Sequence, residues 1–161
     1  MLKLYLDSSV LLKRYVTELG TKITDEIFDR AEAGELTIVI SLWNIGEALG
    51  VLDERHRRSW LSQKEFVQTL NGFVSEIVKL IELKTLEVIP VHTPILTEAW
   101  DIVMTSHIYE ADALQISTCK YSKSNALITA DRKLCEASNE TGVNSFNITE
   151  DEKLRQLMQN G

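Results

Sequence analysis

The chain has 161 residues, and its 17 lysines and arginines against 24 aspartates and glutamates give a formal net charge of −7. The length suits one compact domain covering residues 1–161, and the apolar (44%) and charged (25%) fractions exclude wholesale disorder. The acidic balance argues against binding of polyanions through bulk charge. No apolar run approaches the roughly 20 residues that span a bilayer, and the two cysteines form no CxxC pair. We therefore expect a reduced, cytoplasmic protein without a membrane segment.

The first half of the chain alternates short apolar segments with amphipathic ones. Residues 2–6 (LKLYL) form an apolar run, and residues 36–40 (LTIVI) are rich in β-branched side chains, so both are predicted strands. Between and after them we predict helices, from the spacing of apolar residues and from a capping box at Ser62–Glu65. These helices cover residues 8–17, 21–33, 42–54 and 63–83. The basic cluster at residues 55–58 is expected at an exposed tip between two of them.

The second half continues the alternation. Its predicted strands are LEVI, ALIT and the short VNSF, at residues 86–89, 126–129 and 143–146. Its predicted helices cover residues 93–106, 111–121 and 131–138, followed by a polar helix from residue 151. Strands that alternate with helices from end to end indicate βαβ units. We therefore predict an α/β fold, a three-layer α/β/α sandwich around a mostly parallel central sheet.

Two acidic residues follow predicted strands directly. Asp7 comes after LKLYL, and Asp131 follows ALIT by one residue. Parallel sheets place their chemistry outside the carboxyl ends of the strands, so both acids are candidate site residues. Each also precedes a helix, where aspartate is a favoured N-cap. The two interpretations are compatible, because a capping carboxylate can keep one oxygen available.

Glu47 is the third candidate. It lies in the predicted helix 42–54 with Trp43 four residues before it and Val51 four residues after it, on one helix face. A carboxylate in an apolar column is costly unless it is paired, protonated or bound to a metal. The simpler alternative is a partly exposed glutamate beside a tryptophan.

Asp112 and two hydroxyl residues complete the candidate set. Asp112 opens the predicted helix ADALQISTC, where a favourable interaction with the helix dipole is the alternative explanation. Ser9 and Thr129 lie two positions from Asp7 and Asp131, and either hydroxyl could serve only a turn. Four carboxylates directed at one spot repel one another and need divalent cations. Ligation by oxygen alone, without clustered His or Cys, favours Mg²⁺ or Mn²⁺.

At these residues the sequence resembles the PIN domain family, and within it the toxin nucleases of VapBC-type toxin–antitoxin pairs. The similar segments are YLDSSVLLKRYVTELG with Asp7 and Ser9, SLWNIGEALG with Glu47, EADALQIST with Asp112, and LITADRKL with Thr129 and Asp131. Each motif alone is weak, but four in order across nearly the whole chain are specific. The third segment departs from the family's small alanines at Ser117 and Cys119, which we expect to affect helix packing.

The resemblance implies an α/β/α sandwich, Mg²⁺- or Mn²⁺-dependent RNA cleavage, inhibition by a small antitoxin that covers the site, and a homodimer. In this hypothesis the four acids Asp7, Glu47, Asp112 and Asp131 bind one or two cations. The cations activate a water for in-line attack on phosphorus and stabilise the leaving 3′-oxygen. Ser9 and Thr129 orient a carboxylate or a metal-bound water.

Positive side chains must still guide the RNA past an acidic site. Lys13 and Arg14 follow Asp7 by one to two turns, and Arg132 adjoins Asp131, so these are the candidate RNA contacts. For each, the simpler interpretation is a solvated surface charge. With a net charge of −7, RNA affinity is expected to be modest and sensitive to salt.

Two other functions are compatible with the pattern. A PIN-fold protein that only binds RNA or a partner is one, although the presence of all four acids argues against it. An aspartyl-phosphate phosphatase or receiver-like domain also places an aspartate after its first strand. Such a phosphatase usually has a second acid two residues later, where this chain has Ser9.

Overall fold

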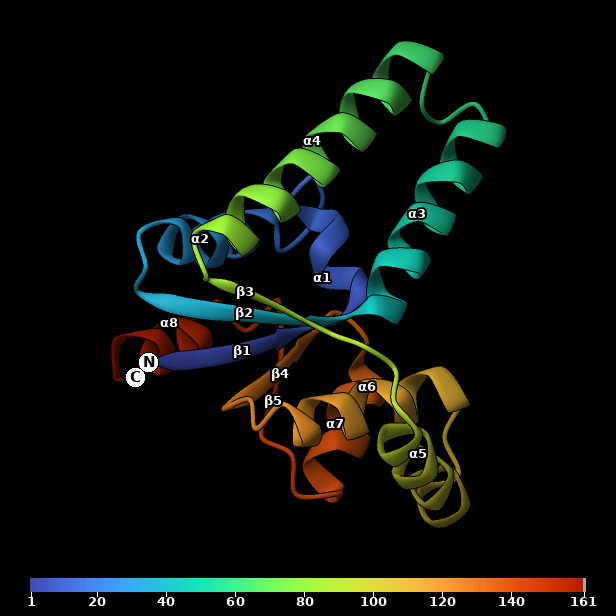
Figure 1. The fold of residues 1–161 in the computed structure, drawn as a ribbon, viewed down its shortest axis with the longest axis vertical. Coiled ribbons are helices and arrows are strands. Elements are labelled where there is room, and N and C mark those ends of the chain that lie inside the picture. Colours follow the sequence, from blue (N-terminus) through green and yellow to red (C-terminus); the bar gives the residue numbers. More distant parts are fainter. Residues whose placement is uncertain (161) are drawn as a thin grey trace.

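Five short strands form one sheet through the middle of the computed structural model, which describes residues 1–160 (Figure 1). They are β1 (Leu2–Leu6), β2 (Leu36–Ser41), β3 (Leu86–Ile89), β4 (Ala126–Thr129) and β5 (Ser145–Asn147). The strand order is β3-β2-β1-β4-β5, and every neighbouring pair is parallel. The carboxyl ends of all five strands therefore lie along one edge of the sheet.

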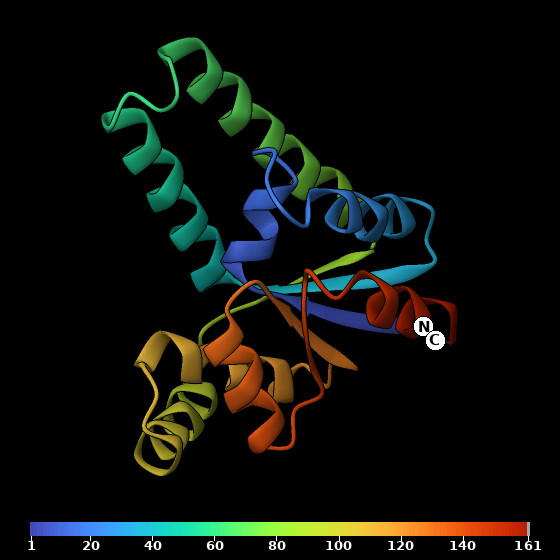
Figure 2. The same ribbon diagram turned by 180° about the vertical axis from the view of Figure 1, so that it is seen from behind.

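Helices cover both faces of the sheet, as Figures 1 and 2 show. One core joins the sheet to α1 (Ser8–Lys13), α2 (Thr21–Glu32), α4 (Gln63–Glu82) and α8 (Asp151–Asn160). The other core joins it to α5 (Thr93–Ser106), α6 (Glu110–Tyr121) and α7 (Arg132–Glu140). Alternation along β1 separates the two cores, since Leu4 and Leu6 belong to the first and Tyr5 to the second. The predicted three-layer sandwich is confirmed.

The remaining helix, α3 (Leu42–Arg57), pairs with α4 in a long hairpin that projects from the sheet (Figure 1). A separate small core at its base contains Leu12, Ala48, Leu52 and Phe73, so α1 wedges between the two arms. The amino end of α3 stays at the edge of the sheet because Ser41 closes β2 and caps the helix. The hairpin thus anchors the segment around Glu47 next to the strand ends.

Two helix ends differ from the predicted ones by more than about two residues. The first helix ends at Lys13 instead of continuing to residue 17, and the chain turns before Gly20, at φ 95°, which is the N-cap of α2. The third helix extends to Arg57, so most of the basic cluster expected at a tip forms its last helical turn. Ion pairs from Arg57 to Asp53 and from Arg58 to Glu54 stabilise that turn, and positive side chains suit a helix carboxyl end.

Among residues 1–160, no helix is long and apolar enough to cross a membrane. Gly161, the last residue of the predicted domain, lies outside the described residues.

Candidate active site

Asp7 lies where β1 ends and α1 begins, and it is buried, with 5% of its surface exposed. As the N-cap of α1 it accepts a hydrogen bond from the Val10 N–H to Oδ1 at 3.1 Å. Two hydroxyls also donate to it at 2.6 Å, Ser9 Oγ to Oδ1 and Thr129 Oγ1 to Oδ2. The carboxyl group is therefore held in one orientation by three donors.

The pKa of Asp7 is raised to about 6. Burial is the main cause, and the donated hydrogen bonds act in the opposite direction. The negative charge of Glu47 adds to the rise, so these two carboxylates face the same space. A buried carboxyl group with a raised pKa beside another acid is typical of functional sites.

The two predicted hydroxyl residues connect β1 to the segment that follows β4. Thr129 Oγ1 donates to Asp7 and accepts from the Asp131 N–H at 2.9 Å. Ser9 Oγ donates to Asp7 and accepts from the Ala130 N–H at 3.0 Å. These paired bonds fix the carboxyl end of β4 against that of β1, which places Asp131 beside Asp7.

Asp131 and Asp112 each lie in the first turn of a helix. The N-cap bonds of Asp131 both reach Oδ1, from the Lys133 N–H (2.7 Å) and the Leu134 N–H (3.3 Å). Asp112 is partly buried, and burial, followed by the charges of Asp131 and Glu47, raises its pKa. Asp112 is thus near enough to Asp131 and to Glu47 for their negative charges to act on it.

Glu47 lies in the second turn of α3 and is partly exposed. The predicted apolar neighbour Trp43 is itself 47% exposed, so the column around Glu47 is open to solvent on one side. Its partner is Gln115 of α6, whose Nε2 donates to Oε2 at 3.0 Å. The structure thus matches the simpler description, a partly exposed glutamate beside a tryptophan, with one carboxylate oxygen bonded to Gln115.

Gln115 was not among the predicted site residues. It is 4% exposed and lies one turn after Asp112. Its Oε1 accepts hydrogen bonds from Tyr5 Oη at 2.6 Å and from Asn44 Nδ2 at 2.8 Å. A glutamine among the apolar residues of ADALQIST was the available indication, because a buried amide needs partners.

The four acids do not form a compact cluster of metal ligands in this structure. Among residues 1–160, no three His, Cys, Asp or Glu side chains lie close enough together to hold an ion as they stand. The donor chemistry nevertheless fits Mg²⁺ or Mn²⁺, because all four candidate residues carry carboxylates, and burial together with the charges of neighbouring acids raises the pKa of Asp7 and of Asp112.

The predicted RNA contacts of α1 are engaged elsewhere. Arg14 forms ion pairs with Glu76 and Asp25 at 2.9 Å and with Asp29 at 3.3 Å. Lys13 is 8% exposed and pairs with Glu18 at 3.3 Å. Both cations therefore stabilise the packing of α1, and their geometry does not favour a contact to phosphate.

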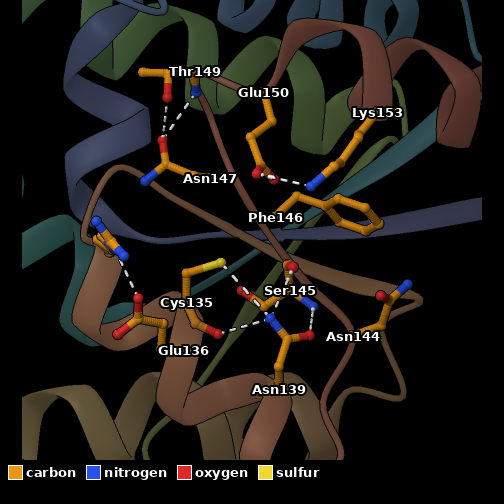
Figure 3. A pocket seen from close by; sticks show the side chains of 11 residues that line it. Cys135, Glu136, Asn139, Asn144, Ser145, Phe146, Asn147, Thr149, Glu150 and Lys153 are labelled. Atoms are coloured by element: carbon orange, nitrogen blue, oxygen red, sulfur yellow. Dashed lines mark hydrogen bonds and ion pairs between the residues drawn. The ribbon is translucent and has the colours of Figure 1, made fainter.

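A pocket of about 680 Å³, shown in Figure 3, lies between α7, β5 and the start of α8, and Arg132 is one of its lining residues. Its guanidinium pairs with Glu136 at 2.7 Å, and its side chain is 87% exposed. Across the pocket Lys153 pairs with Glu150 at 2.9 Å. These opposite charges neutralise one another within the pocket, which does not include the four acids. Arg132 directly follows Asp131 in the sequence and also lines this pocket.

A smaller apolar pocket of about 160 Å³ adjoins the acids on the other side. Trp43 and Trp100 line it together with Leu96 and Leu114, and Glu110 stands beside them. Trp100 is 60% exposed. This pocket gives the molecule an exposed apolar surface next to Glu47 and Asp112.

Comparison with known proteins gives a family match. The family model for the PIN domain matches residues 4–140. No curated protein matches the chain in a sequence search.

Solved structures share the fold at low sequence identity. FitAcB from Neisseria gonorrhoeae is 16% identical with a TM-score of 0.69, over 91% of this chain and 99% of that one. VapC20 from Mycobacterium tuberculosis, described as a sarcin–ricin loop cleaving toxin, is 12% identical with a TM-score of 0.55, over 77% and 86%. A toxin–antitoxin complex from Klebsiella pneumoniae is 16% identical with a TM-score of 0.52, over 79% and 85%. At these identities the likeness shows the fold.

Proposed function

Because the chain belongs to the PIN domain family, we propose that it is a metal-dependent endoribonuclease and the toxin of a VapBC-type toxin–antitoxin pair. One observation carries the proposal. Burial, with the negative charges of neighbouring acids added to it, raises the pKa of Asp7 and of Asp112, and those neighbours are Glu47 and Asp131. Such mutual repulsion is expected of ligands that share a cation.

In this proposal the four carboxylates would hold Mg²⁺ or Mn²⁺. The bound ion supplies an activated water and a counter-charge for the phosphate. The chain's own groups fix the ligands: Ser9 and Thr129 hold both oxygens of Asp7. Each hydroxyl is oriented in turn by a backbone N–H. The Ala130 N–H donates to Ser9 Oγ, and the Asp131 N–H donates to Thr129 Oγ1.

Arg132 is the proposed contact to the RNA backbone. It directly follows Asp131, and its pair with Glu136 is exposed, so little free energy is needed to exchange that carboxylate for a phosphate. The substrate is RNA in single-stranded or looped form, whose backbone can enter a cleft. A small antitoxin and a second copy of the chain are the proposed protein partners, consistent with the toxin–antitoxin complex among its structural neighbours.

A cleavage assay tests the proposal. Purified protein should cut single-stranded RNA in Mg²⁺ or Mn²⁺ and not in EDTA, leaving a 5′-phosphate and a 3′-hydroxyl. Asp7→Asn keeps the size and the capping oxygen but removes a ligand charge, so cleavage should fall by roughly a hundredfold or more. Asp53→Asn, an exposed acid on the projecting hairpin, is the matched control and should cleave normally.

Cleavage that persists in Asp7→Asn, or that needs no divalent ion, would contradict this function. RNA binding without cleavage by the wild-type protein would support the alternative, a PIN-fold binding protein. The phosphatase alternative has weaker support, because the position two residues after Asp7 holds a serine whose hydroxyl donates to Asp7.

A further inference from the structure

A chain of buried polar groups links the three elements that carry Asp7, Glu47 and Asp112. Tyr5 lies two residues before Asp7 on β1 and is fully buried. Asn44 lies one turn before Glu47 on α3, and Gln115 lies one turn after Asp112 on α6. Each of these three side chains thus comes from a segment that also supplies one acid.

A backbone donor determines which atoms donate and which accept along this series of hydrogen bonds. The Ser41 N–H can only donate, and it donates to Asn44 Oδ1 at 2.7 Å in the capping box of α3. The amide nitrogen of Asn44 must then face Gln115, and Asn44 Nδ2 donates to Gln115 Oε1 at 2.8 Å. An amide that could otherwise be flipped is therefore oriented by the backbone.

The same logic extends to the candidate ligand. Because Gln115 Oε1 accepts from Asn44 Nδ2, the Nε2 group is directed to Glu47, where it donates to Oε2 at 3.0 Å. Asn44 is fully buried and Gln115 nearly so, which makes loss of either partner costly. The two amides Asn44 and Gln115, called the amide chain below, end on one oxygen of Glu47.

We propose that Gln115 is a positioning residue that fixes the Glu47 carboxylate at the acidic site through the amide chain. The proposal rests on the endoribonuclease function proposed above. The fixed start at Ser41 and the buried course of the chain leave Glu47 Oε2 with a permanent donor. The orientation of Glu47 is thereby set before any ligand arrives.

The main test replaces Gln115 with methionine, which has nearly the same length but cannot donate to Glu47. In Mn²⁺, kcat for RNA cleavage should fall about tenfold to a hundredfold while KM changes little. Mn²⁺ affinity, measured by electron paramagnetic resonance without RNA, should fall about tenfold or more. Tyr5→Phe is the matched control, because it removes a buried hydroxyl from the network but leaves the bonds from Ser41 through Asn44 and Gln115 to Glu47 intact.

Tyr5→Phe should lower the unfolding temperature while keeping kcat and Mn²⁺ affinity within about twofold of wild type. The losses of kcat and Mn²⁺ affinity are then compared with the loss in unfolding temperature. If they stand in the same proportion in Gln115→Met and in Tyr5→Phe, the role of Gln115 is structural and the inference is wrong. Wild-type Mn²⁺ binding and cleavage in Gln115→Met would also overturn it.

A third measurement separates this inference from the proposed function. The side-chain amide resonances of Gln115 in ¹⁵N–¹H spectra should shift in Glu47→Ala and remain unchanged in Asp131→Asn, whether or not the protein cleaves RNA. Absence of cleavage with the expected shifts would refute the nuclease and retain the positioning of Glu47. Unchanged resonances in Glu47→Ala would refute the positioning itself.

Discussion

Asp7 is a buried acid whose charge has no cation beside it in the metal-free protein, so it should make stability depend on pH. Its pKa is about 6 in the folded protein against 3.8 without burial. Between these values the folded state holds a proton that the unfolded state has lost, and stability therefore falls as pH rises through this window. Above pH 6 the cost is complete, and two pKa units correspond to about 3 kcal/mol.

We predict that Asp7→Asn raises the free energy of unfolding by about 1–3 kcal/mol at pH 7.5 in EDTA and changes it little at pH 4. The neutral side chain removes the buried charge, but an amide offers only one oxygen to the two hydroxyls, which offsets part of the gain. Urea unfolding at both pH values measures the difference. An effect of the same size at pH 4 and pH 7.5 would show that the charge is not its cause.

Thr129 is the single hydroxyl that touches Asp7 and the backbone of Asp131 together. We predict that Thr129→Val lowers the free energy of unfolding by about 1–3 kcal/mol, because two buried hydrogen bonds are lost in a side chain of similar shape. Cleavage should fall by about tenfold or more, because Asp7 loses a donor. Thr118→Val is the control: it removes a buried hydroxyl that donates to the Leu114 carbonyl and not to an acid, so it should affect stability alone. Equal cleavage by the two variants would contradict the prediction.

Among single residues, the sequence indicated the acidic residues better than it indicated the polar residues that form hydrogen bonds with them. Asp7 and Asp131 follow parallel strands and Thr129 ends one, and such strands present their carboxyl ends together. Asn44 and Gln115 have no such positional rule, because their partners come from elements far apart in the sequence. The same applies to Arg14, whose local position next to the site gave no indication of its partners on α2 and α4.

At the scale of elements, Arg14 joins three helices. It bonds to Glu76 on α4 and to Asp25 and Asp29 on α2, and Tyr15 also donates to Glu76 at 2.6 Å. We predict that Arg14→Met lowers the free energy of unfolding by about 1–3 kcal/mol, because the mostly buried carboxylate of Glu76 loses its cation.

The control for Arg14→Met is Arg57→Met, in which an exposed pair with Asp53 is broken and the change should stay within about 0.5 kcal/mol. Urea unfolding compares the two. RNA affinity of folded Arg14→Met, measured by filter binding, should equal that of wild type, because the guanidinium is occupied by carboxylates. A drop in that affinity without loss of stability would instead restore Arg14 as an RNA contact.

Element boundaries were less predictable than element types. Periodicity located every strand and helix, but it did not end the first helix at Lys13 or carry the third to Arg57. Those ends depend on tertiary partners of Arg14 and on ion pairs within the last turn of α3. Ion pairs within one helical turn can be predicted from the local sequence, whereas partners on other helices cannot.

At the scale of the whole molecule, one face near the acidic site is unusually apolar. Trp100 and Met104 of α5 are 60% and 74% exposed, and Leu42 and Trp43 of α3 are 57% and 47% exposed. The apolar pocket of about 160 Å³ lies between these helices. Large apolar side chains beside a hollow are typical of protein–protein interfaces, and a second copy of the chain is the partner expected here.

We therefore predict that the wild-type protein is a homodimer through this face and that Trp100→Lys raises the dimer dissociation constant at least about tenfold, because a charged side chain would replace an apolar contact. Trp60→Lys is the control, since Trp60 is 67% exposed on the loop of the distant hairpin and stacks only with Arg58. Sedimentation equilibrium measures both variants, and unfolding temperatures confirm that neither is misfolded. A monomeric wild-type protein, or dissociation caused by Trp60→Lys and not by Trp100→Lys, would contradict this assignment of the apolar face.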